Sequence, residues 1–114
     1  MTSRTAPPSS IKNDGIIELD SELGKRLGFT SDKFDGYLWK IGNYIYISFI
    51  ESKNKGKGNF SRFLQEIIKA GFGIKVPTPM GRMPLILAHK GFKPTTEFFP
   101  EVGEDVDVWV LEAK

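Results

Sequence analysis

The chain has 114 residues, enough for one modest domain, and its 39% hydrophobic and 26% charged residues are typical of a globular protein. A formal net charge of +2 excludes a chain that is basic throughout, so any polyanion-binding character must be local. The chain has no cysteine and one histidine, His89, which excludes disulfides and thiolate chemistry and argues against a histidine-built metal site.

The N-terminal segment MTSRTAPPSS lacks the apolar core of a secretory signal, and its prolines and small polar residues predict a disordered lead-in over residues 1–14. We expect a single domain over residues 15–114. No apolar run reaches the roughly 18 residues of a membrane span. Because the absence of cysteine fits a reducing compartment, we expect a cytoplasmic protein.

The first elements in chain order are strands. GIIEL (15–19) follows a turn-like Asn-Asp-Gly and predicts a strand, whereas residues 21–29 fit one or two helical turns or a loop. GYLWKIGNYIYISFI is rich in aromatic and β-branched residues and is interrupted at Gly42-Asn43, which predicts a hairpin of strands 36–41 and 44–51. Strict alternation in the second strand would place Tyr44, Tyr46, Ser48 and Ile50 on one face, and Ile45, Ile47 and Phe49 on the other.

A helix is expected next, over residues 60–70, because its apolar residues recur with helical spacing. These residues are Phe60, Phe63, Leu64, Ile67 and Ile68. Asn59 is the expected N-cap and Gly71 the expected residue after the C-cap.

The last third of the chain predicts a strand over 72–76 that stops at Pro77, a helix over 82–90, and strands over 92–99 and 105–113. In the final strand, alternation places Val106, Val108 and Val110 opposite Trp109 and Leu111. The expected class is therefore α+β, with a mixed, mostly antiparallel central sheet and two helices.

The loop between the hairpin and the longer helix is the strongest functional signal. Lys53, Lys55 and Lys57 surround Gly56 and Gly58, directly before a helix N-terminus. Unpaired helix N–H groups, the helix dipole and flexible glycines together suit a phosphate or pyrophosphate. An ordinary exposed turn has the same composition, and the spacing matches neither a P-loop nor a dinucleotide-binding loop.

The order of elements and two motifs resemble the GNAT superfamily of N-acetyltransferases. KNKGKG (53–58) is similar to the family's coenzyme A signature, Arg/Gln-x-x-Gly-x-Gly/Ala, with Lys53 at the first position. LILAHKGFKPTTEFF (85–99) is similar to the family's late helix, Gly-Phe pair and strand. The resemblance covers about residues 36–113, so the chain would be a minimal member, truncated at the N-terminal side, like the small acetyltransferases of phages.

The resemblance implies an acetyl-CoA-dependent transfer of an acetyl group to a primary amine of a protein or a small molecule. Phe49 and Ile50 would lie along the pantetheine arm, and an N–H near Ile50 would polarise the acetyl carbonyl. Arg82 could contact phosphate or substrate from its position before the late helix, or be an ordinary solvated cation there. The residues implied in pyrophosphate binding are Lys53, Asn54, Lys55, Gly56, Lys57, Gly58 and Asn59.

The resemblance also implies a catalytic base near the end of the hairpin's second strand, for which Glu51 is the candidate. From the residues themselves, Ser48 could position water, and His89, near the end of the late helix, is a further candidate. Each has an ordinary alternative, as a solvated carboxylate, a strand serine and a surface or capping histidine. The family often has a catalytic tyrosine where this chain has Leu87.

Two alternatives remain open. Leu87 motivates a binding or inhibitory protein of the same fold without chemistry, acting on a host protein if the chain is phage-encoded. The cluster of Lys53, Lys55, Lys57 and Arg62 motivates nucleic-acid binding, which the low net charge disfavours. A short chain with an aromatic-rich sheet is also compatible with a dimer.

Overall fold

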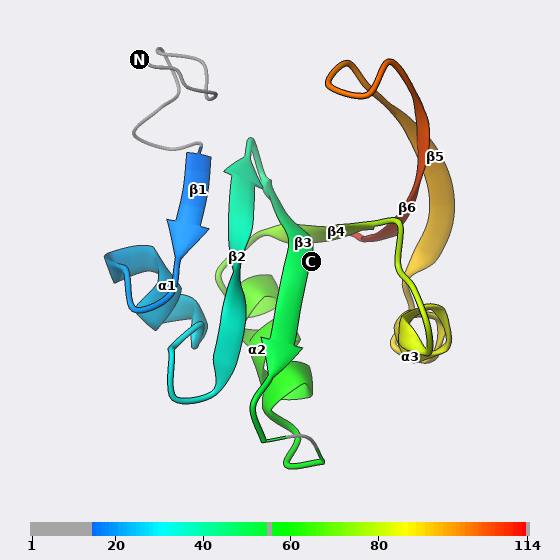
Figure 1. The fold of residues 1–114 in the computed structure, drawn as a ribbon. Coiled ribbons are helices and arrows are strands. Elements are labelled where there is room, and N and C mark those ends of the chain that lie inside the picture. The colour runs from blue at the N-terminus through cyan, green and yellow to red at the C-terminus, as the bar shows by residue number, and fades with distance from the viewer. Residues whose placement is uncertain (1–14, 55, 114) are drawn as a thin grey trace.

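The protein is built on one six-stranded sheet, seen in a computed structural model that describes residues 15–54 and 56–113 (Figure 1). The elements are β1 (Gly15–Glu18), α1 (Glu22–Leu27), β2 (Phe34–Ile41), β3 (Tyr44–Ser52), α2 (Asn59–Lys69), β4 (Gly73–Pro77), α3 (Met83–His89), β5 (Lys93–Phe99) and β6 (Glu104–Leu111). The α+β class and the order of the elements are confirmed. The expected lead-in over 1–14 lies outside the described residues. The sheet carries three helices rather than two, because the segment left open as helix or loop forms α1.

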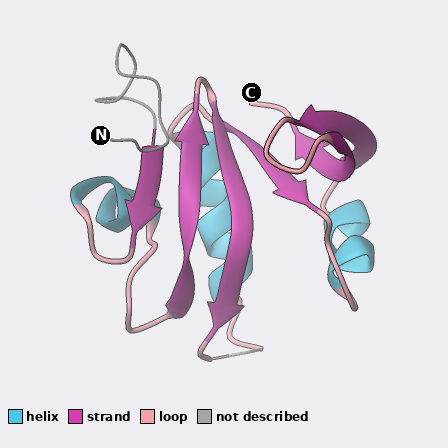
Figure 2. Cartoon of the chain, turned by 45° about the horizontal axis from the view of Figure 1, so that its top comes forward, coloured by secondary structure: helices cyan, strands magenta, loops and turns pink. Residues whose placement is uncertain are grey.

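The sheet has the order β1-β2-β3-β4-β6-β5. Its neighbours are antiparallel except for β3 and β4, which α2 connects and which run parallel. The β2–β3 hairpin is confirmed, with Ile41 opposite Tyr44 and Gly42 at a φ of 62° in the two-residue turn. The hairpin of β5 and β6 curves strongly away from the plane of the other strands (Figure 2).

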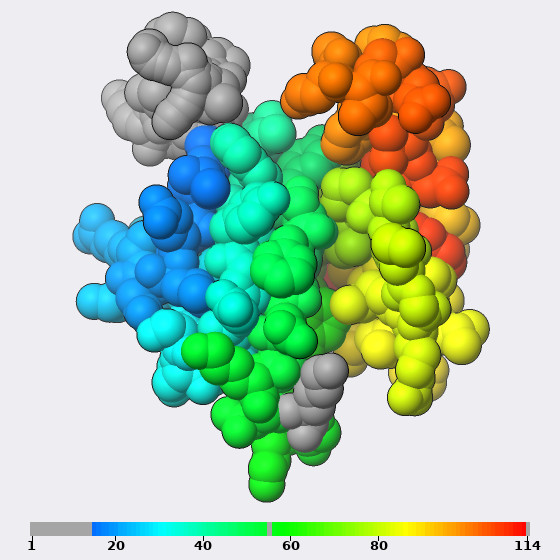
Figure 3. Space-filling view, viewed as in Figure 1, coloured from blue at the N-terminus to red at the C-terminus, as the bar shows by residue number. Residues whose placement is uncertain are grey.

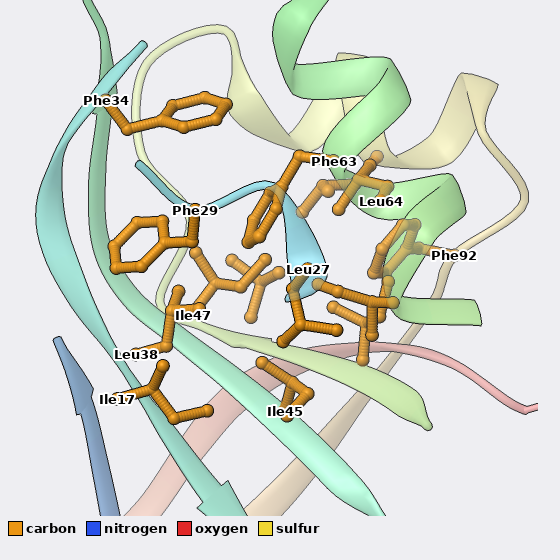
Figure 4. Close-up of a cluster of buried hydrophobic side chains, with 14 residues drawn as sticks. Ile17, Leu27, Phe29, Phe34, Leu38, Ile45, Ile47, Phe63, Leu64 and Phe92 are labelled. Carbon is orange, nitrogen blue, oxygen red and sulfur yellow. The ribbon is translucent and has the colours of Figure 1, made fainter. Parts of the chain in front are cut away.

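The hydrophobic core lies between one face of this sheet and the helices (Figure 4). At its centre the rings of Phe29, Phe34 and Phe63 pack with centroids 6.1, 5.7 and 5.3 Å apart. The buried residues of this cluster are Ile17, Leu27, Phe29, Phe34, Leu38, Ile45, Ile47, Phe63, Leu64, Ile67, Ile74, Val76, Leu87 and Phe92. The residues that α2 contributes are those that the helical periodicity predicts to be apolar.

A β-bulge in β3 overturns part of the predicted alternation. Tyr37 pairs with Phe49 and Trp39 pairs with Tyr46, so Ile47 and Ser48 together lie opposite the single residue Leu38. Beyond the bulge, the side chains lie on the faces opposite to those predicted: Ile50 packs against the core, and Phe49 is exposed beside the ring of Tyr37. The prediction that Phe49 shares a face with Ile45 and Ile47 is therefore wrong, because strict alternation does not allow for an inserted residue.

The ends of the later elements differ by one or two residues from the prediction, and at α2 and β4 the difference concerns the residue expected to cap or stop the element. The N-cap of α2 is Gly58, with a φ of 78°, and not Asn59, whose side-chain oxygen accepts a hydrogen bond from the Arg62 guanidinium at 2.6 Å. Pro77 is the last residue of β4, opposite Val108, rather than the residue that stops the strand. The prediction for Gly71 is confirmed: it follows the C-cap with a φ of 96°.

Candidate functional site

The parallel strands β3 and β4 separate after a short paired stretch. Their register runs only from Tyr44 opposite Gly73 to Tyr46 opposite Lys75, and the rest of β3 pairs with β2 alone. We call residues 47–52 the free edge of β3, because on the side of β4 their backbone has no strand partner among the described residues. Figure 1 shows β4 turning away from β3, and the surface is hollowed between β3 and α3 in Figure 3.

Two features fix the geometry at this edge. The first is the bulge, which gives Ile47–Ser48 an irregular backbone at the start of the free edge. The second is Gly36 on β2, whose φ is 128°; a Cβ there would lie 2.3 Å from the carbonyl oxygen of Phe49. Glycine is therefore required at position 36 for β2 to approach β3 this closely.

The free edge leads directly into the loop that the sequence singles out. Gly56 and Gly58 both have positive φ, at 83° and 78°, a conformation that favours glycine. The N–H groups of Gly56, Gly58, Asn59, Phe60 and Ser61 donate to no described residue, whereas the Arg62 N–H donates to the Gly58 carbonyl at 3.0 Å. Unpaired N–H groups at a helix N-terminus are suited to bind an anion.

Two cationic side chains at this loop are hydrogen-bonded to carbonyl groups of the chain itself. Lys53 extends the β2–β3 ladder by donating its N–H to the Lys33 carbonyl at 2.8 Å, and its ammonium donates to the Ser31 carbonyl at 2.8 Å. The Arg62 guanidinium donates to the Lys57 carbonyl at 3.1 Å. Both side chains therefore brace the loop, while the Lys57 side chain is exposed. Lys55 lies outside the described residues.

The opposite side of the hollow is formed by α3. Lys90, just after this helix, donates through its ammonium to the Ser61 hydroxyl of α2 at 2.6 Å and so links the two helices. Arg82 is the N-cap residue of α3, and its exposed side chain makes no hydrogen bond or ion pair within the described chain. Lys90 could not be predicted from the sequence, because nothing near it in the chain indicates that a residue after α3 reaches the first turn of α2.

The three catalytic candidates do not form a constellation. Ser48, Glu51 and His89 are exposed, and the structure shows no side-chain hydrogen bond or ion pair for any of them among the described residues. Glu51 lies directly opposite another carboxylate, Asp35, on the β2–β3 ladder. Leu87 is fully buried in the core, at 0% exposure. A residue at that position therefore faces the core and not the hollow.

A polar cluster at the point of separation was not predicted. The Tyr46 hydroxyl donates to Glu97 at 2.8 Å, and the Lys75 ammonium donates to the other Glu97 oxygen at 2.6 Å and to the Tyr46 hydroxyl at 3.3 Å. Lys75 also lies over the ring of Tyr44, 4.3 Å from its centroid. The cluster holds the curved β5–β6 hairpin against the sheet face opposite α2.

The cluster changes the ionisation of its members. Burial alone would raise the pKa of Glu97 and lower that of Lys75, but their mutual hydrogen bond and the bonds to Tyr46 outweigh burial. The pKa of Glu97 is therefore lowered and that of Lys75 raised, so both stay charged near neutral pH. Burial, followed by the bond to Glu97, raises the pKa of the Tyr46 hydroxyl, which stays protonated.

Among residues 15–54 and 56–113, no group of His, Cys, Asp and Glu side chains is arranged to hold a metal ion. Within the same residues, no helix has both the length and the apolar character needed to cross a membrane. Comparisons of the chain with protein-family models, curated proteins and solved structures found no match. The case for a function therefore rests on the geometry of this chain.

Proposed function

We propose that the chain adopts an acyl-CoA N-acyltransferase fold of the GNAT type and transfers an acetyl group from acetyl-CoA to a primary amine. The observation that carries this proposal is the separation of the parallel strands β3 and β4 directly before a glycine loop with unpaired N–H groups. The free edge of β3 and the glycine loop form one continuous path, which offers hydrogen-bond partners first to an extended, amide-bearing ligand and then to a pyrophosphate.

The free edge of β3 is suited to the pantetheine arm of acetyl-CoA. Its unpaired N–H and C=O groups can bind the ligand's amides as an added strand would be bound. Phe49 and Ile50 belong to this edge, and the irregular backbone of the bulge directs N–H groups differently from a regular strand. An N–H in this stretch can stabilise charge on a carbonyl oxygen during acyl transfer.

The loop is suited to the pyrophosphate. Gly56, Gly58 and Asn59 offer N–H groups that have no partner in the described part of the chain, and the dipole of α2 adds about half a positive charge at its N-terminus. Lys57 can add its charge from an exposed position. Lys53 holds the start of the loop in place through its hydrogen bonds to the Ser31 and Lys33 carbonyls.

Acetyl transfer requires the acceptor amine to lose a proton. Glu51 remains the candidate base: it is exposed, two residues beyond Phe49, and the adjacent Asp35 favours a cationic amine at this end of the sheet. Since Leu87 is buried, α3 supplies no proton donor at that position. Holding acetyl-CoA and the amine in the correct geometry would then account for much of the rate acceleration. The acceptor would be a protein lysine, a protein N-terminus or a small amine.

One observation favours a second candidate, a binding protein of the same fold without chemistry. Among residues 15–54 and 56–113, the catalytic candidates Ser48, Glu51 and His89 have no side-chain partners that would orient them. Nucleic-acid binding is weakened by the structure, because the Lys53 and Arg62 side chains are engaged with carbonyl groups of the chain itself.

Thermal unfolding with and without acetyl-CoA tests the cofactor site. A ligand at a hundred times its dissociation constant stabilises the native state by about 2.7 kcal/mol. We expect this stabilisation in the natural protein and its loss in Gly56→Glu, where a carboxylate would enter the loop. Gly103→Glu is the matched control, because Gly103 has a similar φ of 73°, against 83° for Gly56, and lies in the β5–β6 turn.

The outcomes separate the proposals. Stabilisation that survives in Gly56→Glu, or that is lost equally in Gly103→Glu, contradicts the loop assignment. Release of free coenzyme A with a panel of amines and lysine peptides then distinguishes the enzyme from the binding protein: binding without turnover favours the second candidate.

A further inference from the structure

A second concave site lies between α1 and α2. A cavity of about 280 Å³ opens here. The residues that line it are Lys25, Arg26, Leu27, Gly28, Lys33, Asn59, Arg62, Phe63 and Glu66. The sequence analysis did not single it out, because its cations come from three separate segments.

The site is strongly positive. Four of its side chains, Lys25, Arg26, Lys33 and Arg62, are cationic and only one, Glu66, is anionic. Within the described chain, no carboxylate lies within ion-pair distance of any of the four cations, and the Glu66 carboxylate is directed at Lys69, 3.8 Å away. The mutual repulsion of these cations is relieved when an anion binds between them.

The site has a rigid floor. Leu27 and Phe63 are buried core residues, at 0% and 2% exposure, and they connect the cavity to the centre of the core. At one wall, Gly28 ends α1 with a φ of 80° and donates its N–H to the Lys25 carbonyl at 3.1 Å. At the other wall, the Arg62 guanidinium is held by Asn59 and by the Lys57 carbonyl.

The cations of this site lie apart from the proposed coenzyme A path, although Asn59 borders both. Asn59, Arg62, Phe63 and Glu66 are spaced i, i+3, i+4 and i+7, so they share the face of α2 that is directed at α1. Ser61, which Lys90 contacts, lies on the side of α2 directed at α3. The two sites therefore flank the helix on either side of its buried stripe.

We propose that the groove between α1 and α2 binds a compact anion with two or three linked phosphate groups, such as a free diphosphate or triphosphate. Several cations around one cavity match a ligand with several charges, and the forked guanidinium group of Arg26 suits phosphate oxygens, while Arg62, held by Asn59 and the Lys57 carbonyl, adds positive charge at the wall. The volume lies just below the roughly 300–1,000 Å³ of pockets for drug-sized ligands, which favours a chain of phosphates over a large organic molecule.

Calorimetric titration with inorganic pyrophosphate and tripolyphosphate tests the proposal on the full chain. We expect binding to the natural protein and, since each charge-assisted contact contributes to it, a loss of about tenfold or more in Arg26→Gln/Lys33→Gln. Lys93→Gln, which removes an exposed cation on β5, is the control and should bind unchanged. Glu66→Gln removes the only carboxylate of the groove and should bind more tightly, a gain that partial unfolding cannot produce.

Four results would overturn the proposal. These are no binding of pyrophosphate or tripolyphosphate, whether or not an oligonucleotide binds, equal affinities in the double variant and the natural protein, equal losses in Lys93→Gln, and competition by acetyl-CoA. The separation of the two sites is tested with acetyl-CoA present at saturation. Unchanged pyrophosphate affinity supports a distinct groove, whereas competition places the phosphates of both ligands in one site and overturns it.

Discussion

The ion pair of Lys75 and Glu97 should contribute more to stability than any exposed ion pair of this chain. Its N–O distance is 2.6 Å, with side chains 17% and 31% exposed, and Tyr46 donates to the same carboxylate. The pair of Lys69 and Glu66 provides a natural comparison, since its distance is 3.8 Å and its side chains are 74% and 46% exposed. Both pairs join a lysine to a glutamate, so burial and geometry are the main differences.

The magnitude follows from these surroundings. Hydrogen bonds to charged groups contribute about 1.5–3 kcal/mol, and partial exposure places this pair towards the lower end. We therefore expect a coupling energy of about 1–2 kcal/mol from the double-mutant cycle of Lys75→Met and Glu97→Gln. The exposed pair, with Lys69→Met and Glu66→Gln, should give about 0.2–0.5 kcal/mol, as for other helix pairs.

The assay is equilibrium unfolding in urea, with the free energy of unfolding of each single and double variant. The reasoning would be refuted if the coupling energy of Lys75 and Glu97 were no larger than that of Lys69 and Glu66. Addition of salt provides a second check, because screening should weaken the exposed pair more than the half-buried one.

Three further outcomes are expected. Phe63→Ala removes a ring packed against two buried phenylalanines and should lower the free energy of unfolding in urea by about 3–5 kcal/mol. Phe98→Ala, at an exposed position, should lower it by less than about 0.5 kcal/mol, and equal losses would contradict the assignment of the core. The lowered pKa of Glu97 contributes stability that is present above its ordinary pKa of 4.5 and is lost as the pH falls through the folded-state value, so acid should destabilise the natural protein more than Glu97→Gln. Leu87→Tyr should lower stability by about 1–3 kcal/mol through overpacking and yield no faster acetyl transfer; a gain in rate would place this side chain in the hollow.

Much of the fold is predictable because its signals are local. The helical spacing of Phe63, Leu64 and Ile67 predicts the buried face of α2, and Gly42-Asn43 between two aromatic runs predicts the hairpin. Each of these features depends on residues a few positions apart. Local physical preferences therefore suffice for them.

The parts that could not be predicted depend on residues far apart in the chain. Glu97 meets Tyr46 and Lys75 only because the β5–β6 hairpin curves back over the sheet, and nothing near Glu97 indicates this curvature. The bulge arises from the pairing of β3 with β2, so the sequence of β3 alone reads as regular. The N-cap of α2 was predicted wrongly because asparagine and glycine both occur often at this position. Asn59 was the expected N-cap, but its side-chain oxygen accepts a hydrogen bond from Arg62, and Gly58 is the N-cap instead.

The bulge also determines what a change in chain length would do to this protein. At a regular position of a strand, loss of one residue exchanges the two faces of everything beyond it. Loss of Ser48 would instead remove the offset between β3 and β2, because Ile47 alone would then lie opposite Leu38, and regular alternation would keep Ile50 on the core face and Phe49 outside. A deletion of one residue at this position would therefore straighten the strand and remove the irregular backbone of the free edge without exchanging its two surfaces.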